Sequence, residues 1–304
     1  MKSLLIGSLP LIILFVAFGI LISLIFIIKF SIRKKKRRLP FTENFLRSPG
    51  QSLIKQIDDI NDEISSYLFC ALTLPIFVYA IHISQSYFGN AKETASRIIT
   101  TAALAIGLIV FSAFKLMKSI FRRRELRLGC DGELVVGQEL NQLMLNGYCV
   151  YHDFPADKFN IDHIVVGPAG VFAIETKARR KPISGNGTAD AKVTYDGRQL
   201  KFPHKIEVKS IQQSKRQAKW LSQCLSKAIG TQVSTIPALL LPGWFVERII
   251  APDGLLVMNP KFFCSWVVRS KNRVLSQAAI SQISHQLEQK CRDVKPVVNF
   301  ERQK

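Results

Sequence analysis

The sequence is poor in acidic residues and in cysteine. Its 304 residues include 22 Asp and Glu against 42 Lys and Arg, which gives a net charge of +20. The six cysteines form no C-x-x-C pair and show no ligand spacing with histidine, which argues against a structural zinc site. Scattered thiols are typical of a reducing compartment, so we expect most of these cysteines to be packing residues rather than a disulfide framework.

Charged residues are missing from three long apolar stretches. Residues 4–28, 67–88 and 98–114 contain 25, 22 and 17 consecutive positions without Asp, Glu, Lys or Arg. A bilayer core needs about 20 apolar residues per helix, so the sequence predicts three transmembrane helices. A cleaved signal peptide is the alternative for the first stretch, but its length and the lack of a small-x-small site argue against it. Transport is not favoured, because His82 is the only titratable candidate within a span.

The basic residues beside these stretches predict the topology. Clusters at 33–38 and 115–127 flank the first and third spans, whereas the loop at 89–96 is short and neutral. The positive-inside rule then places the N-terminus outside a cytoplasmic (inner) membrane that the chain crosses several times. The expected parts are a first transmembrane helix at 1–32, a cytoplasmic linker at 33–65, two further helices at 66–118 and a cytoplasmic domain at 119–304.

The linker contains a short amphipathic pattern at 53–64. Ile54, Ile57, Ile60 and Ile64 recur at helical spacing with acids between them. Such a helix could lie against the lipid bilayer or a neighbouring segment. It could also join two copies of the chain, so a homo-oligomer formed through 53–64 or through the transmembrane helices is open.

The remaining residues, 119–304, keep 28 of the bases and 16 of the acids, an excess of 12 positive charges that is compatible with a phosphate-rich partner. Their pattern predicts an α/β domain with a mixed central sheet. We expect helices near 131–146, 206–229 and 275–292, the first closed by Gly147, and strands near 148–153, 161–167, 171–177, 192–195, 198–202, 235–241 and 255–258.

Two acids and a lysine stand out in the stretch NIDHIVVGPAGVFAIETKA, residues 160–178. A Gly-Pro-Ala-Gly turn predicts an antiparallel hairpin, whose pairing would gather Asp162, Glu175 and Lys177 at one end. Carboxylate oxygens suit Mg²⁺ or Mn²⁺, and an ammonium can orient water or offset charge on a phosphoryl group. Hydrolysis of a phosphodiester would use all three residues. The alternative is an ion pair of Lys177 with either acid, which spacing alone does not exclude.

The same stretch belongs to a longer pattern. GCDGE at 129–133, GYCVYHDF at 147–154 and the hairpin together resemble the NERD domain, a nuclease-related branch of the PD-(D/E)XK superfamily. The segments ALLLPGW at 238–244 and DGLLVMNP at 253–260 are similar to later strands of that family. The resemblance implies a restriction-endonuclease-like fold, with a mixed central sheet flanked by helices.

The resemblance also implies roles for single residues. Asp162 and Glu175 would be the principal ligands of Mg²⁺ or Mn²⁺, Glu133 would join them directly or through water, and Lys177 would be the catalytic lysine. Family members carry a glutamine on the next helix near the site. Gln213 is our choice because Leu221 follows it at the expected spacing, with Gln212 and Gln217 as alternatives.

Other polar and aromatic residues have less specific interpretations. His163 should point away from Asp162 by strand alternation, as a packed or hydrogen-bonded residue. The tryptophans Trp220 and Trp244 are expected in the core. The basic residues of the long helix form either a solvated face or a track for phosphates; they are Lys205, Lys209, Lys215, Arg216 and Lys219.

The sequence therefore predicts a membrane-anchored, metal-dependent nuclease that acts on nucleic acid, and the family resemblance implies DNA rather than RNA. One alternative is a domain of the same fold that binds nucleic acid without cutting it. Another is a membrane sensor or assembly protein in which the spans are the functional part and the domain is its output.

Overall fold

A computed structural model describes residues 2–34, 42–88, 92–181, 191–251, 254–270 and 272–296. The chain divides into two compact units. The first holds helix α1 and most of helices α2 and α3, and the second consists of Glu43–Ile57 and Glu125–Pro296. Residues 43–57, which precede the apolar part of α2, therefore belong to the same unit as the predicted nuclease-like domain.

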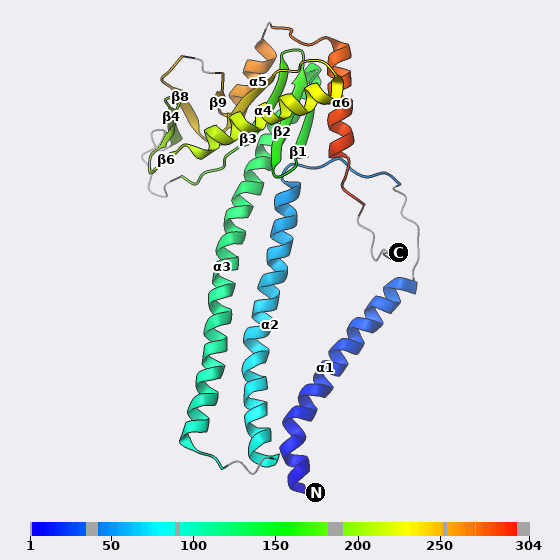
Figure 1. Cartoon of the computed structure of the whole chain (residues 1–304), viewed down its shortest axis with the longest axis vertical. Coiled ribbons are helices and arrows are strands. Elements are labelled where there is room, and N and C mark those ends of the chain that lie inside the picture. The colour runs from blue at the N-terminus through cyan, green and yellow to red at the C-terminus, as the bar shows by residue number, and fades with distance from the viewer. Residues whose placement is uncertain are drawn as a thin grey trace. The chain divides into compact units, whose positions relative to one another are not determined.

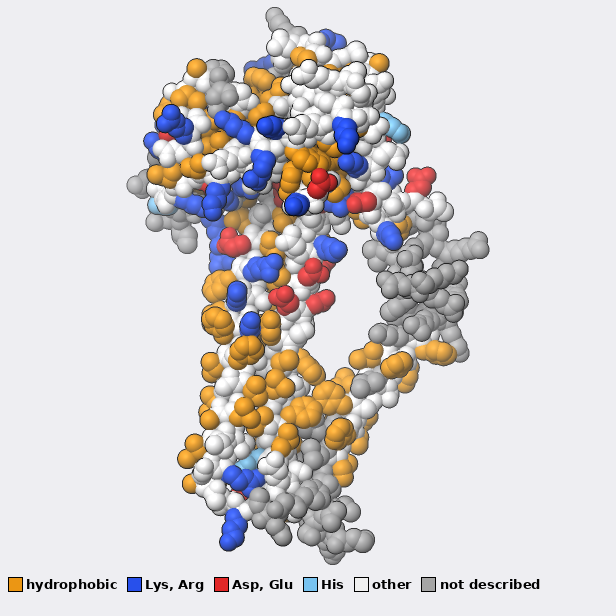
Figure 2. All heavy atoms as spheres, viewed as in Figure 1, with side chains coloured by type: hydrophobic (Ala, Val, Ile, Leu, Met, Phe, Trp, Pro, Cys, Tyr) orange, Lys and Arg blue, Asp and Glu red, His pale blue; other side chains and the backbone are white. Residues whose placement is uncertain are grey.

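The first unit is built from three long helices, α1 (Lys2–Lys34), α2 (Gln51–Phe88) and α3 (Ala95–Asn141) (Figure 1). By length and composition, α2 and α3 are long and apolar enough to cross a membrane, whereas the apolar stretch described in α1 is shorter, Phe15–Ile28. Figure 2 shows hydrophobic side chains exposed along these helices. Two of the three predicted spans thus have suitable helices, and the number of spans and their topology stay predictions. Residues 35–38 of the first basic cluster and 89–91 of the short loop lie outside the described residues.

Helix α3 has no new start near 131, where the sequence pattern predicted one. It continues unbroken to Asn141 because residues 115–128 contain no proline and are rich in Lys, Arg and Leu, which favour helix. A short 3₁₀ helix, η1 (Gln142–Asn146), follows and ends at Gly147, whose φ of 81° is left-handed. The predicted stop at Gly147 is confirmed.

The main sheet of the second unit is mixed, as predicted. Its order is β1-β2-β3-β7-β9, antiparallel across β1, β2 and β3 and parallel from β3 to β9. The strands are β1 (Cys149–Pro155), β2 (Asn160–Gly167), β3 (Gly170–Thr176), β7 (Thr235–Leu240) and β9 (Leu256–Met258). The tight β2–β3 turn ends at Gly170, where a φ of 126° requires glycine.

A second, smaller sheet, which the sequence pattern did not predict, contains the predicted strands near 192–202. Its order is β6-β5-β4-β8, formed by β4 (Lys192–Tyr195), β5 (Leu200–Phe202), β6 (Lys205–Glu207) and β8 (Phe245–Arg248). The Asp196-Gly197 turn joins β4 and β5 as predicted. The hairpin leaves the main sheet because β4 pairs with β8, a strand that the sequence pattern did not predict.

Helices cover both faces of the main sheet. On one face, α4 (Lys209–Ile229) and α6 (Gln277–Cys291) pack on Ile164, Val166 and Ala173. On the other face, α3, η1 and α5 (Pro260–Arg269) pack on Val165 and Phe172. Alternate residues of β2 and β3 thus enter opposite cores, which confirms a mixed sheet flanked by helices. The kinship to restriction-endonuclease-like folds stays a prediction.

Candidate functional site

The β2–β3 hairpin brings acidic residues together at the end opposite its turn. The pair His163 and Ile174 fixes the register, which sets Asp162 across from Glu175. The backbone N–H of Thr176 donates to Asp162 Oδ2 at 2.7 Å. The placement predicted from the hairpin is therefore present, while the catalytic and metal-binding roles of these residues stay predictions.

Glu175 is almost fully buried and both its carboxylate oxygens are engaged. The Lys177 ammonium bonds to Oε1, and the Gln217 side-chain amide donates to Oε2 at 2.7 Å. Burial alone would lower the pKa of Lys177, but the charge of Glu175 and its hydrogen bond raise that pKa above the ordinary value. The ion pair considered from the sequence is thus formed, within a larger group of acids.

The glutamine at this carboxylate is Gln217, not the preferred Gln213. Gln217 is buried on α4 and also donates to the Asn160 carbonyl at 3.1 Å. Gln213 lies one turn earlier and is half-buried, and Gln212 is exposed. Sequence spacing did not reveal which side of α4 faces β3, because that depends on how the helix packs.

Glu133 approaches the same acids from α3. Its side chain is buried, and its Oε2 has no hydrogen-bond partner among the described residues. Burial, then the charges of Asp153 and Glu175, raises the pKa of Glu133 to about 8, although Lys177 and the Gly50 backbone N–H act in the opposite direction.

Asp162 experiences the same crowding. Loss of hydration on burial, followed by the charges of Glu175 and Glu133, raises the pKa of Asp162 well above its ordinary range. The Thr176 N–H and the charge of Lys177 lower that pKa but do not offset the rise. The crowded carboxylates of Glu133, Asp162 and Glu175 form a site in which a bound cation would relieve repulsion.

A fourth acid, Asp153 of β1, lies beside the site and was not among the predicted site residues. The pairs flanking it, His152 with His163 and Phe154 with Ile161, set Asp153 across from Asp162. Its φ of 48° is unusual for a residue with a side chain. The sequence does carry a signal for this placement: His152-Asp153 and Asp162-His163 occur in reverse order in two adjacent strands, as antiparallel partners would.

His163 packs away from the acids, as predicted. Its Nδ1 lies 2.9 Å from Nδ1 of His152, and His152 Nε2 lies 3.0 Å from Asn141 Oδ1. Burial lowers the pKa of both imidazoles, that of His152 to about 4. These histidines are neutral, buried groups on the α3 side of the sheet.

The donors fit a hard divalent cation in their chemistry. Carboxylate oxygens of Glu133, Asp162 and Glu175 are the type that Mg²⁺ and Mn²⁺ prefer, and one of them is buried without a partner among the described residues. However, in the part of the chain that the structure describes, no group of three or more His, Cys, Asp or Glu is already arranged around a metal position.

Basic residues lie on the face of the second unit that carries α4 (Figure 2). Lys209, Lys215, Arg216 and Lys219 are all exposed on this helix. The tryptophans have structural contacts: Trp220 packs on Phe154 and Phe159, and Trp244 is buried beside Phe202. Both agree with the predicted core positions.

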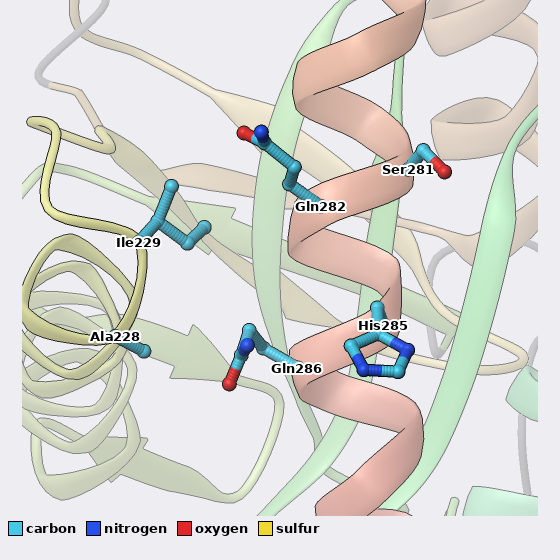
Figure 3. Close-up of a pocket in the computed structure, with 6 residues that line it drawn as sticks. All are labelled: Ala228, Ile229, Ser281, Gln282, His285 and Gln286. Atoms are coloured by element: carbon cyan, nitrogen blue, oxygen red, sulfur yellow. The ribbon is translucent and has the colours of Figure 1, made fainter.

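A cavity of about 450 Å³ lies between the end of α4 and α6 (Figure 3). It is lined by Ala228, Ile229, Ser281, Gln282, His285 and Gln286. None of the carboxylates described above borders it, so it is separate from the acidic site.

One comparison with known proteins finds a family for the part of the chain that contains the acidic site. Residues 128–242 match the NERD family, described as a nuclease-related domain. The NERD region contains Glu133, Asp162, Glu175, Lys177 and Gln217. No curated protein and no solved structure matches the chain. The NERD region ends before β8, β9, α5 and α6, and it leaves out residues 43–57 of the same unit.

Proposed function

We propose that this protein is a membrane-anchored, metal-dependent nuclease that hydrolyses phosphodiester bonds of nucleic acid. The observation that carries the proposal is the meeting of Glu133, Asp162 and Glu175 with Lys177 at one end of the β2–β3 hairpin, inside the NERD region. Crowded buried carboxylates beside a lysine are costly for stability, and such arrangements concentrate at functional sites.

Asp162 and Glu175, with Glu133 directly or through water, would hold Mg²⁺ or Mn²⁺. When bound, the ion would supply Lewis-acid stabilisation of charge on the phosphoryl oxygens. Gln217 fixes the orientation of Glu175 through its 2.7 Å hydrogen bond. Lys177, held beside Glu175, is placed to orient the water whose oxygen bonds to phosphorus as the bond to the leaving oxygen breaks.

The substrate class follows from charge and from the NERD match. An exposed basic helix beside an acidic site would contact the phosphate backbone while the acids act at one phosphodiester. DNA is proposed over RNA on the family resemblance. The membrane anchor is proposed on α2 and α3, whose length and composition suit a span, with the second unit on the cytoplasmic side.

A test would incubate the full-length protein in detergent with linear duplex, circular duplex and single-stranded DNA, and with RNA. Each substrate would be tried with Mg²⁺, with Mn²⁺ and with EDTA, beside Asp162→Ala and the exposed control Asp157→Ala. We expect metal-dependent cleavage of DNA that Asp162→Ala abolishes and Asp157→Ala retains. Cleavage of RNA without cleavage of any DNA would show that the substrate is RNA and not the proposed DNA.

A second candidate is a domain that binds nucleic acid without cutting it. It is favoured by the contacts at Glu175, because Lys177 and Gln217 already bond to both of the carboxylate oxygens that would bind the metal ion. Binding of DNA that is equal in the wild type and in Asp162→Ala, with no cleavage under either metal, would assign this function instead.

A further inference from the structure

Residues 44–52 lie outside the NERD region but pack against it, and we call them the clasp. Phe45 and Val294 form an antiparallel bridge, with backbone N–H to O distances of 2.7 and 3.2 Å. The Arg47 N–H also donates to the Cys291 carbonyl at 3.0 Å. The clasp is thereby attached to the end of α6, far along the chain.

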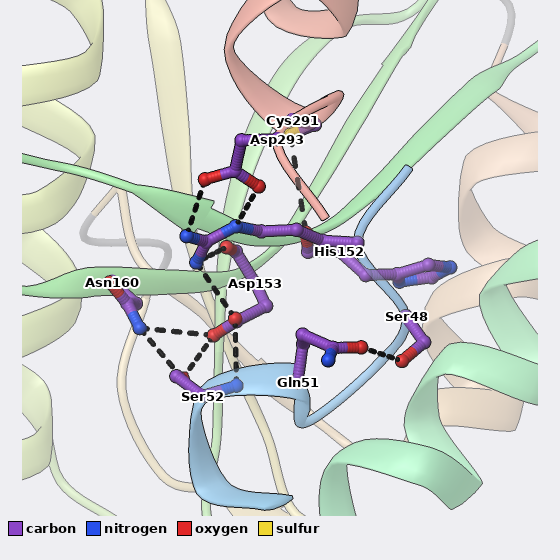
Figure 4. A network of polar contacts seen from close by, with 9 residues as sticks. Ser48, Gln51, Ser52, His152, Asp153, Asn160, Cys291 and Asp293 are labelled. Carbon is purple, nitrogen blue, oxygen red and sulfur yellow. Dashed lines mark hydrogen bonds and ion pairs between the residues drawn. The ribbon is translucent and has the colours of Figure 1, made fainter. Parts of the chain in front are cut away.

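The Arg47 side chain links the clasp to two acids, Asp153 and Asp293, which are labelled in Figure 4. Its Nε and Nη2 donate to the two carboxylate oxygens of Asp293, each at 2.7 Å. Its Nη1 donates to the Asp153 carboxylate at 3.0 Å and to the Asp153 carbonyl at 3.1 Å. A planar guanidinium suits this double role, whereas a lysine ammonium does not.

Asp153 is the buried centre of the clasp contacts. Besides Arg47, its carboxylate accepts from the Ser52 N–H at 2.9 Å, from the Ser52 hydroxyl and from the Asn160 amide at 3.1 Å. The Ser52 contacts satisfy donors in the first turn of α2. These contacts also hold Asp153 in its left-handed backbone conformation.

Two routes connect the clasp to the acidic site. On the first, Gly50 packs beside Cys130 of α3, three residues before Glu133, and its backbone N–H is one of the groups that lower the pKa of Glu133. Gly50 has a φ of 71°, and a Cβ there would lie 3.1 Å from Cys130 Sγ, so both its conformation and its close approach favour glycine. On the second, Asn160 binds Asp153 through its amide and accepts from Gln217 through its carbonyl, and Gln217 holds Glu175.

We propose that the clasp is a positioning part of the active site: Gly50 sets Glu133, and Arg47 and Ser52, through Asp153 and Asn160, set Gln217 and Glu175. This proposal rests on the proposed nuclease function. The NERD region alone thus lacks groups that orient its own acids. The clasp is also continuous with the first turn of α2, a helix long enough to span a membrane.

The test compares the full-length wild type with Arg47→Ala, Arg47→Lys and Ser52→Ala. Arg127→Ala is the matched control, because Arg127 forms an exposed ion pair with Asp131 on α3. Cleavage kinetics give kcat and KM, and amide hydrogen exchange reports on residues 44–52, 130–136 and 213–219. We expect Arg47→Ala to lower kcat about tenfold to a hundredfold with little change in KM, as for other groups that orient metal ligands. Arg47→Lys and Ser52→Ala should lie between it and the wild type.

Hydrogen exchange separates this proposal from the nuclease proposal. Faster exchange in 130–136 and 213–219 as well as in 44–52 supports the clasp, even if the wild type cuts no substrate and the nuclease proposal fails. Faster exchange confined to 44–52, or an Arg47→Ala variant with wild-type kcat, would overturn it.

Discussion

At the scale of single residues, the acidic site is defined by which partner each oxygen has. Glu175 is held by Lys177 and Gln217, Asp162 by the Thr176 N–H, and Glu133 keeps one buried oxygen without a partner among the described residues. Gln217 is therefore expected to set the direction of Glu175 rather than to react itself.

Replacing Gln217 with alanine should lower the cleavage rate about tenfold to a hundredfold, because Glu175 would lose the bond that orients it. Gln223→Ala is the matched control, since Gln223 is exposed on the same helix. Steady-state kinetics on DNA would measure both. Equal rates for the two variants would contradict the assigned orientation.

The buried histidines should make the fold sensitive to acid. Burial lowers the pKa of His152 to about 4 in the fold, below the ordinary value of 6.5, so the unfolded chain binds the proton more readily. The contribution of each histidine to stability is then complete above about pH 6.5 and falls as the pH approaches 4, by up to about 1.4 kcal/mol per pH unit. Thermal unfolding between pH 7.5 and 4.5 would measure the decline.

His152→Gln should flatten that decline, because one of the two buried imidazoles in contact, His152 and His163, is removed. His285→Gln is the control, since His285 is exposed on α6. An unchanged pH profile in His152→Gln would show that the pair does not govern acid stability.

At the scale of elements, local patterns predicted what local contacts determine. The β2–β3 hairpin and the stop at Gly147 follow from a short turn and a single glycine, so the position of Asp162, Glu175 and Lys177 could be predicted. The position of Gln217 rather than Gln213 at Glu175 depends on which side of α4 faces β3, and that is set by packing. The helix predicted to begin near 131 is instead the last part of α3, which runs without a break to Asn141.

Long-range pairing was not visible in the sequence. Arg47 meets Asp153 and Asp293 across about a hundred or more residues, and nothing local to Arg47 indicates either partner. The second sheet was missed for the same reason, because β4 joins β8 only after α4 and β7 intervene.

The clasp should be required for a stable second unit. A fragment of residues 119–304 lacks the strand partner of Val294 and the guanidinium that binds Asp153 and Asp293. We expect a synthetic peptide of residues 43–57 to raise the Tm of this fragment, since a ligand of the folded state stabilises it. The same peptide with Arg47→Ala should raise it less. Equal shifts from both peptides would contradict the role of Arg47.

At the scale of the whole molecule, charge and hydrophobicity are distributed unequally. The excess of positive charge is shared between the segments beside the apolar helices and the domain that holds the NERD region. Composition by itself therefore indicates both a membrane and a phosphate-rich partner. It does not indicate that residues 43–57, at the start of a candidate span, belong to the unit with the acids, because that depends on pairing between distant segments.

The most direct test of the proposed nuclease is cleavage of linear duplex DNA by the full-length protein with Mg²⁺, measured for the wild type, Lys177→Ala and Lys158→Ala. Lys158 is an exposed lysine in the β1–β2 connection, so it controls for loss of one positive charge. We predict cleavage by the wild type and Lys158→Ala, none with EDTA, and a loss of activity in Lys177→Ala. Metal-dependent cleavage that persists undiminished in Lys177→Ala would contradict the proposed role of the acidic site and its lysine.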